Sequence, residues 1–333
     1  VVRNNFYGFQ WAGFVNVVNG ASEGVHLAGF LNTIREEHNG IKAAGFMNVT
    51  DDNSRSVSGA GFMNVTRGNV EGIGGAGFMN VSGGNTMGAM GAGFMNVSGG
   101  DSQGVYGAGF GNISAGNMQG IQLAGFMNVA GDVQGFQVAG FLNAAREVEG
   151  FQLGFINVSD TISGVPVGFL SITRKGGLRQ LELSASDVMY ANLSYKIGVS
   201  AFYNIFSVGA KPMEDKTFSA TGYGIGSRIK LSPQRSFLQL EAHSYQIYHE
   251  WDWWKNQNTN LLNEFRALYY HSLHERLQLF GGVVLYNHIY KTTHEYSAED
   301  LELTQRSFHD YQWNDHTAQW WTGARAGITF VIR

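Results

Sequence analysis

The chain of 333 residues contains no cysteine, only 3 prolines and few charged residues. The absence of cysteine excludes disulfide bonds and every metal or iron–sulfur site that is built on thiolates. Charged residues make up only 14% of the chain and the formal net charge is −4, so we expect no nucleic-acid partner. No run of about 18 apolar residues occurs, so no transmembrane helix is expected, whereas a membrane β-barrel fits this composition because its strands alternate.

Glycine and hydrophobic residues are abundant instead. The chain has 46 glycines and is 44% hydrophobic and 13% aromatic, which is enough apolar surface to form a core. Collagen is excluded, because glycine does not recur at every third position and proline is scarce. The first residue is Val1 rather than Met, which we interpret as a processed or trimmed N-terminus.

The composition changes near residue 175. Residues 1–175 contain 35 of the 46 glycines, whereas residues 176–333 contain six of the seven tryptophans and eight of the ten histidines. We therefore expect two domains, a glycine-rich repeat domain at 1–175 and a different domain at 176–333.

An internal repeat fills the first domain. A Gly-Phe pair recurs with a spacing of 16 residues for seven steps, then 15, then 14 twice. The phenylalanines are Phe14, Phe30, Phe46, Phe62, Phe78, Phe94, Phe110, Phe126, Phe141, Phe155 and Phe169. An asparagine follows two residues after each of the first ten, and Ser171 follows the last: Asn16, Asn32, Asn48, Asn64, Asn80, Asn96, Asn112, Asn128, Asn143 and Asn157.

The repeat predicts β-structure, because several glycines per unit disfavour a helix and the apolar residues alternate. We expect about nine strand residues and a turn in each period. One predicted face carries Ile121, Leu123, Gly125, Met127 and Val129, and the other carries Gln122, Ala124, Phe126 and Asn128.

Two architectures fit the repeat. In a β-solenoid of about 11 coils, equivalent residues stack about 4.8 Å apart, so that Phe lies on Phe and Asn on Asn in ladders. In the alternative, each unit is one membrane strand and the whole chain forms a single barrel of about 18 strands, which would make a pore. The turns show no two-unit alternation, which favours the solenoid. Because both strand faces are apolar, the solenoid should expose a stripe of Phe and Ala or of Met and Val.

The second domain predicts an eight-stranded antiparallel β-barrel. The expected strands are 177–186, 189–198, 199–210, 218–231, 235–248, 262–273, 276–290 and 318–332. Short connections alternate with longer ones, which is typical of an outer-membrane barrel, and tyrosines and tryptophans cluster near strand ends as in interfacial girdles. A soluble barrel that binds a small apolar ligand is the alternative. Strand parity places both barrel ends on the short-turn side, so the repeat domain is predicted to be periplasmic, with surface exposure as the other option.

The repeat units resemble bacterial surface-repeat proteins built from tandem Gly-Phe/Leu-x-Asn-Val units. The stretches GFQLGFINVSDTISGVPVGFLSITRKG at 150–176, LELSASDVMYANLSYKIGVSAFYNIFSVGAKP beyond it and the C-terminal WWTGARAGITFVIR are similar to a poorly characterised group of Bacteroidota-type outer-membrane β-barrel proteins. The resemblance covers most of the chain. It implies an envelope location and provides no catalytic residue to transfer.

The sequence offers no catalytic, cofactor or nucleotide motif, so we expect a protein that is not an enzyme and needs no cofactor. Histidine is the only candidate metal ligand: His243 shares a strand face with Glu241, and the remaining histidines of this domain are expected at turns and loops. We therefore predict no metal site.

Two long loops are the candidate partner-binding sites, because aromatic residues among polar ones suit an interface. The aromatic residues that we expect to bind a partner are Trp251, Trp253 and Trp254 in the loop 249–261, and Tyr311 and Trp313 in the loop 291–317, which also contains Tyr296 and Phe308. The combined expectation is an outer-membrane protein of a Gram-negative bacterium, with lipid around its barrel and a repeat scaffold that binds another envelope protein.

Overall fold

The computed structural model describes residues 1–212, 217–232, 235–249, 259–292, 303 and 307–332. The described residues contain only β-strands and connections, and the chain divides into two compact units, Val1–Lys175 and Gly176–Arg333. The first unit is a parallel β-solenoid and the second is a closed antiparallel β-barrel. The predicted fold class is therefore confirmed, and the alternative of one barrel of about 18 strands is wrong.

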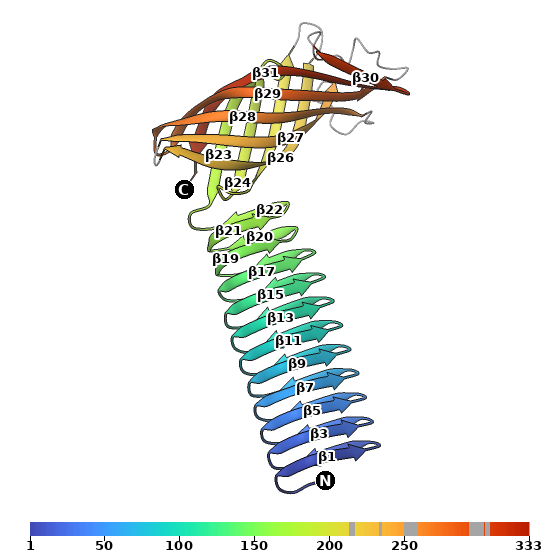
Figure 1. Ribbon diagram of the computed structural model, residues 1–333. Coiled ribbons are helices and arrows are strands. Elements are labelled where there is room, and N and C mark those ends of the chain that lie inside the picture. The colour runs from blue at the N-terminus through green and yellow to red at the C-terminus, as the bar shows by residue number, and fades with distance from the viewer. Residues whose placement is uncertain (213–216, 233–234, 250–258, 293–302, 304–306, 333) are drawn as a thin grey trace. The chain divides into compact units, whose positions relative to one another are not determined.

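Each solenoid coil contains a long strand and a short strand joined by a corner (Figure 1). The long strands are β1 (Phe6–Ala12), β3 (Ser22–Ala28), β5 (His38–Ala44), β7 (Ser54–Ala60), β9 (Val70–Ala76), β11 (Thr86–Ala92), β13 (Ser102–Ala108), β15 (Met118–Ala124), β17 (Val133–Ala139), β19 (Glu147–Leu153) and β21 (Thr161–Val167). The short strands are β2 (Val15–Val18), β4 (Leu31–Ile34), β6 (Met47–Thr50), β8 (Met63–Thr66), β10 (Met79–Ser82), β12 (Met95–Ser98), β14 (Gly111–Ser114), β16 (Met127–Val129), β18 (Leu142–Ala144), β20 (Ile156–Ser159) and β22 (Leu170–Thr173).

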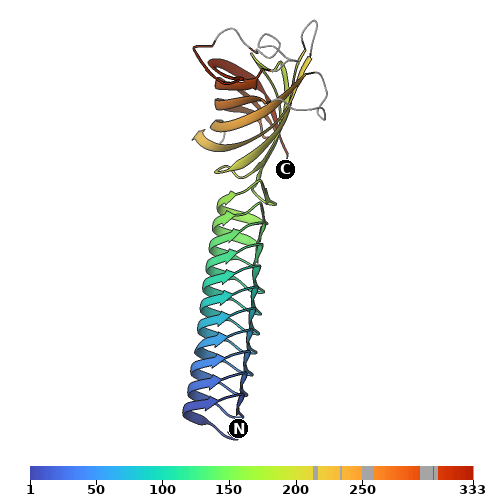
Figure 2. The ribbon, with the colours of Figure 1, turned by 90° about the vertical axis from the view of Figure 1, so that its right-hand side faces the viewer.

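The long strands form one parallel sheet of eleven strands and the short strands form another. Pairing is in register, so that Asn80 lies beside Asn96 and Gly88 beside Gly104. Figure 2, turned by 90°, shows the same strand and turn repeating from coil to coil. The sixteen-residue period of the sequence is therefore one complete turn of the solenoid.

The predicted nine-residue strand is wrong, because a corner divides it. In the coil that contains Phe126, β15 ends at Ala124 and β16 begins at Met127, with Gly125 and Phe126 between them. A Cβ atom on Gly125 would overlap the carbonyl oxygen of Gly109 in the preceding coil. Glycine is therefore required here by the close stacking of successive corners, rather than by strand pairing.

The second unit has eight strands in a closed ring. They are β23 (Leu178–Ser186), β24 (Ala191–Gly198), β25 (Tyr203–Pro212), β26 (Thr217–Ser232), β27 (Ser236–His249), β28 (Asn260–His274), β29 (Leu277–Lys291) and β31 (His316–Val331). Each strand pairs antiparallel with its neighbour, and β23 pairs with β31 from Gln180 opposite Val331 to Ser186 opposite Arg325, which closes the barrel.

Two predicted details of the barrel differ from the structure. The interval 291–317, expected to be all loop, contains β30 (His309–Trp313), which forms a hairpin with β31. The expected strands 189–198 and 199–210 adjoin directly, whereas the structure has a connection at residues 199–202, because β25 begins only at Tyr203. The sequence contains no sign of β30, because all five of its residues are exposed and show no alternation of burial.

Candidate functional site

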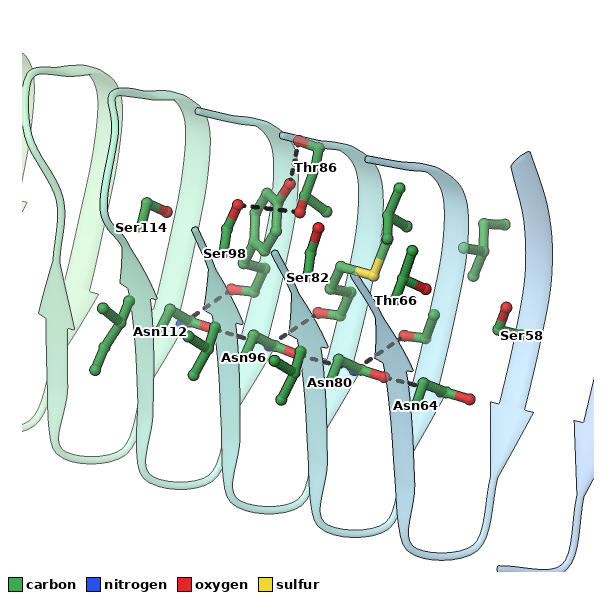
Figure 3. A pocket seen from close by; sticks show the side chains of 18 residues that line it. Ser58, Asn64, Thr66, Asn80, Ser82, Thr86, Asn96, Ser98, Asn112 and Ser114 are labelled. Atoms are coloured by element: carbon green, nitrogen blue, oxygen red, sulfur yellow. Dashed lines mark hydrogen bonds between the residues drawn. The ribbon is translucent and has the colours of Figure 1, made fainter. Parts of the chain in front are cut away.

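The asparagines of the repeat form one continuous hydrogen-bonded ladder inside the solenoid (Figure 3). The side-chain amide of Asn64 donates to the side-chain oxygen of Asn80 at 2.9 Å, and Asn80 donates to Asn96 at 2.8 Å. The same bond joins every pair from Asn16 to Asn157, and the last amide donates to the Ser171 hydroxyl at 3.4 Å. The structure therefore brings all ten predicted asparagines together.

Each amide also connects the two sheets. Asn64 Nδ2 donates at 2.8 Å to the carbonyl oxygen of Gly75, which lies in the long strand of the next coil. Asn96 makes the equivalent bond to the Gly107 carbonyl at 2.9 Å. A leucine, which has the same branched shape, could not satisfy this buried carbonyl, which gives a physical reason for asparagine at this position.

The phenylalanines form a second ladder on the outside of the corner. The rings of Phe30 and Phe46 stack with centroids 4.8 Å apart and planes 2° apart, and the stack continues without interruption from Phe14 to Phe169. Phe62 remains 37% exposed. The prediction that Phe126 and Asn128 share a face is wrong, because the corner turns Phe126 outward while Asn128 is fully buried.

A third ladder lies at the other bend and was missed by the sequence analysis. The side-chain oxygen of Asn53 accepts the backbone N–H of Asn69, and Asn69 accepts that of Asn85, both at 2.8 Å. Asp101 continues the series toward Asn117 at 2.7 Å. The available signal was an Asn or Asp five residues after each of the five ladder asparagines from Asn48 to Asn112. Asp101 is thus a structural turn residue rather than an isolated acid.

The outward side of the short-strand sheet is apolar. Inward and outward positions alternate in the short strands other than β14, so that in β10 Asn80 and Ser82 are buried while Met79 and Val81 face outward. The register places Met79 beside Met95 and Val81 beside Val97. Of the two stripes considered in the sequence analysis, Met and Val therefore form the outward sheet face, bordered by the Phe ladder.

In one column of inward-facing positions the residue type differs from coil to coil. Successive coils carry Gln10, His26, Lys42, Ser58 and Gly74 at this position. Lys42 is buried, and its ammonium group donates to the hydroxyls of Thr50 at 2.6 Å and Ser54 at 2.8 Å. Burial lowers the pKa of Lys42 to about 7.

Two neutral imidazoles lie beside this lysine. His26 bonds to the Ser22 hydroxyl and to Gln10, and its ring meets that of His38 edge-on with centroids 5.3 Å apart. Burial, followed by the nearby Lys42 charge, lowers the pKa of both, that of His38 to about 3. Lys42 bonds only hydroxyl groups, so its ammonium has no carboxylate partner among the described residues.

Ser58 and Gly74 leave a small cavity next in the column, lined also by Thr66, Ser82 and Met90 (Figure 3). Its volume is about 30 Å³. That volume admits about two water molecules and no organic substrate. The solenoid interior is therefore a structural core at this point rather than a ligand site.

The barrel interior holds a closed ring of alternating charges that the sequence analysis also missed. Lys196 pairs with Glu182 at 2.7 Å and with Glu241, and Arg266 pairs with Glu241 at 3.2 Å and with Glu264. Arg325 completes the ring between Glu264 at 3.4 Å and Glu182 at 3.8 Å. All six side chains are fully buried and their formal charges cancel. The one local signal was the pair Glu264 and Arg266, two residues apart on β28, because the other four charges come from four different strands.

The outward barrel surface is apolar instead. Inward and outward positions alternate in β28, where Glu264 and Arg266 are buried while Phe265 is 50% exposed. Val283 is 66% exposed on the neighbouring β29. The other exposed apolar residues of the barrel strands are Leu183, Leu193, Val208, Ile225, Ile229, Leu231, Leu240, Tyr269, Leu273, Leu279 and Phe330.

The predicted partner-binding loops are only partly described. Trp251, Trp253 and Trp254 lie outside the described residues. Tyr311 and Trp313 lie on β30, both exposed, with their rings 5.6 Å apart. Trp313 also stacks on His316 at 5.4 Å. The structure therefore brings Tyr311 and Trp313 together on a hairpin and leaves their proposed role in partner binding as a prediction.

The histidines of the barrel are dispersed. His243 is buried in the lumen and bonds the Ser207 hydroxyl at 3.0 Å, whereas the neighbouring Glu241 is engaged in the charge ring. His288 bonds Asn260 at 2.6 Å. In the described part of the chain, no three His, Asp or Glu side chains are grouped as metal ligands.

Comparisons of the chain with protein-family models, with curated proteins and with solved structures give no match. Within the described residues, no helix is long and apolar enough to cross a membrane.

Proposed function

We propose that this protein is a non-enzymatic component of a Gram-negative envelope, in which the barrel anchors the chain in the outer membrane and the solenoid is a scaffold for protein–protein contact. One observation carries the proposal: the barrel is charged inside and apolar outside. A soluble ligand-binding barrel has the opposite arrangement, with an apolar interior and a polar surface. Lipid is the solvent that favours the arrangement found here.

The outward residues of the barrel would be more stable in lipid than in water. Phe265, Val283 and Leu240 lie on adjacent strands and are all at least 45% exposed. Exposed apolar patches of this extent are rare on monomeric soluble proteins. In a bilayer the same side chains meet acyl chains, and the buried ring of charges stays within the barrel, away from the lipid. The resemblance to outer-membrane repeat proteins agrees with this assignment.

The proposed orientation follows from connectivity. The solenoid ends at Lys175, and β23 begins at Leu178 on the barrel end that also carries the short turn 275–276 and the end of β31. In outer-membrane barrels that end faces the periplasm. The solenoid is thus proposed to be periplasmic, and the hairpin of β30 to be extracellular.

Thiol labelling of intact cells tests membrane location and orientation together, because the chain has no cysteine of its own. The variants are Tyr311→Cys on β30 and Gln103→Cys on the outward side of β13, both at exposed positions. A membrane-impermeant maleimide should label Tyr311→Cys in intact cells and Gln103→Cys only after the outer membrane is permeabilised. Recovery of the chain in the soluble fraction would refute the anchor, and labelling of Gln103→Cys in intact cells would reverse the orientation.

A further inference from the structure

The outward side of the short-strand sheet, called here the Met–Val face, carries no charged residue in any of its eleven strands, all of which the structure describes. Its first column is Val15, Leu31, Met47, Met63, Met79, Met95, Gly111, Met127, Leu142, Ile156 and Leu170, and its second is Val17, Thr33, Val49, Val65, Val81, Val97, Ile113, Val129, Ala144, Val158 and Ile172. The outward side of the long-strand sheet differs, because Glu23, Arg55 and Glu71 are exposed there. Only one of the two sheets therefore has an uncharged outward face.

The borders of the Met–Val face narrow the choice of partner. One border is the Phe ladder, and the other carries ion pairs between neighbouring coils. Arg67 pairs with Asp51 at 3.3 Å, Arg146 with Asp132 at 2.7 Å and Arg174 with Asp160 at 3.2 Å. A surface that lies on a membrane combines its apolar face with excess Lys and Arg that meet acidic lipids. Here these arginines are neutralised by aspartates, which argues against lipid as the occupant.

The size of the Met–Val face matches a dimer interface. Eleven strands about 4.8 Å apart extend for about 50 Å, and a four-residue strand with part of its corner is about 15 Å wide. Each copy therefore offers about 750 Å², close to the roughly 800 Å² that each partner of a stable complex buries. A face of this length needs a partner with apolar residues at the same spacing, and a second solenoid of the same repeat provides it.

We propose that the Met–Val face is the interface between two copies of this chain, which pack sheet against sheet. The inference rests on the proposed function, because it names the partner for which the solenoid is the scaffold. Methionine side chains at repeated positions are adaptable enough to interdigitate between two copies at the usual sheet separation of about 10 Å. The proposed two-fold axis runs along the solenoid, which places each coil opposite the same coil of the partner.

Thiol cross-linking of the full chain in phospholipid vesicles tests the interface. The variants Met47→Cys, Met95→Cys and Met127→Cys place one thiol on the Met–Val face, and the matched controls Gln103→Cys and Gln119→Cys place one on the outward side of the other sheet. A bismaleimide with a span of about 10 Å, the sheet separation, should convert the three face variants to species of twice the mass. We expect yields at least five-fold above those of the controls.

Several outcomes would overturn the proposal. Equal yields for face and control variants would indicate random collision, and products only with proteins of other masses would indicate a foreign partner. Cross-linking of Met95→Cys alone would support a dimer but overturn the parallel arrangement, because the distant coils of an antiparallel pair do not meet their own counterparts.

A second measurement covers the case in which cross-linking is inefficient. Sedimentation of the full chain in detergent should give a dimer, and the double variant Val81→Lys/Val97→Lys should lower the dimer fraction at least ten-fold through charge repulsion, with an unchanged circular dichroism spectrum. A monomeric unsubstituted chain would overturn the proposal. Flotation of the same samples with vesicles reports the anchor separately, so loss of membrane binding and loss of dimerisation are distinguishable.

Discussion

At the scale of single residues, the solenoid interior depends on polar groups that are buried and almost all satisfied by the adjacent coil. Lys42 is the charged exception, because its ammonium donates only to hydroxyl groups and pairs with no carboxylate among the described residues. A buried cation without a counter-charge destabilises the folded state whenever it is protonated.

Lys42 should therefore make the stability of the neighbouring coils depend on pH. Its pKa is about 7 in the folded chain and near 10.5 when unfolded, so the unfolded state binds more protons between these values. Stability should rise with pH across this window, by up to a few kcal/mol, and be lowest below pH 7. Amide hydrogen exchange of β5 and β7 should show this rise, and Lys42→Met should abolish it. The exposed Lys175→Met is the control and should leave the pH profile unchanged.

The Asn ladder should contribute more to the free energy of unfolding than the Phe ladder. Asn64→Ala removes the donor to the Gly75 carbonyl and both bonds along the ladder, which leaves buried polar groups without partners. We expect a loss of about 2–4 kcal/mol. Phe62→Ala removes a stacked but 37% exposed ring and should cost about 1–2 kcal/mol. Urea unfolding of the full chain measures both, and a larger effect for Phe62→Ala would contradict this order.

At the scale of elements, the corner between the long and short strands determines the fold of each coil. It divides one apolar segment into β15 and β16, turns Phe126 outward and keeps Asn128 inside. The corner glycines permit stacking because a Cβ atom there would overlap the carbonyl of the preceding coil.

Two neighbouring glycines provide a direct test of this account. A Cβ atom on Gly77 would overlap the carbonyl oxygen of Gly61, whereas one on Gly75 would meet no atom within 4 Å. Gly77→Ala should therefore lower the thermal midpoint, at a cost above about 2 kcal/mol, while Gly75→Ala should be neutral or slightly stabilising. Equal effects of the two substitutions would show that the corners do not limit stacking.

The stability of the barrel strands depends on the charge ring, as the stability of the solenoid coils depends on the corner glycines. Lys196 is shared by Glu182 and Glu241 in the lumen, so Lys196→Met leaves two buried carboxylates without their common cation. We expect a loss of about 3–5 kcal/mol, measured by urea unfolding in detergent micelles. The double variant Lys196→Met/Glu241→Gln should recover part of that loss, and Leu193→Met on the outward side of the same strand should change little. The ring hypothesis fails if Lys196→Met is as mild as Leu193→Met.

At the scale of the whole molecule, the side chains that fill the barrel lumen argue against transport through it. Trp321, Arg325 and Tyr245 are among the large side chains that are fully buried inside the barrel. An eight-stranded barrel has an interior that side chains fill. The full chain inserted in a planar bilayer should therefore show no conductance steps, and steps of stable size would support transport instead of anchoring.

Much of the architecture could be predicted from periodicity. The sixteen-residue spacing of Phe and Asn predicted stacked coils and both ladders, because in-register parallel stacking is the arrangement that places every equivalent residue on its copy. Strand alternation likewise predicted the eight barrel strands. The strand β30 was missed, since its five exposed residues carry no alternation of burial that a sequence pattern could reveal.

The sequence by itself determined the solenoid, because a fixed period imposes the same backbone on every unit. Only the tertiary structure decided which side chains point inward. The Gly-Phe corner takes Phe126 out of the alternation and turns it to the surface, while Asn128 stays inward like Gln122, and Met127 and Val129 stay outward. Closure of β23 on β31 likewise brings Glu182 to Arg325, residues far apart in the chain, and so completes a charge ring that no local spacing specifies.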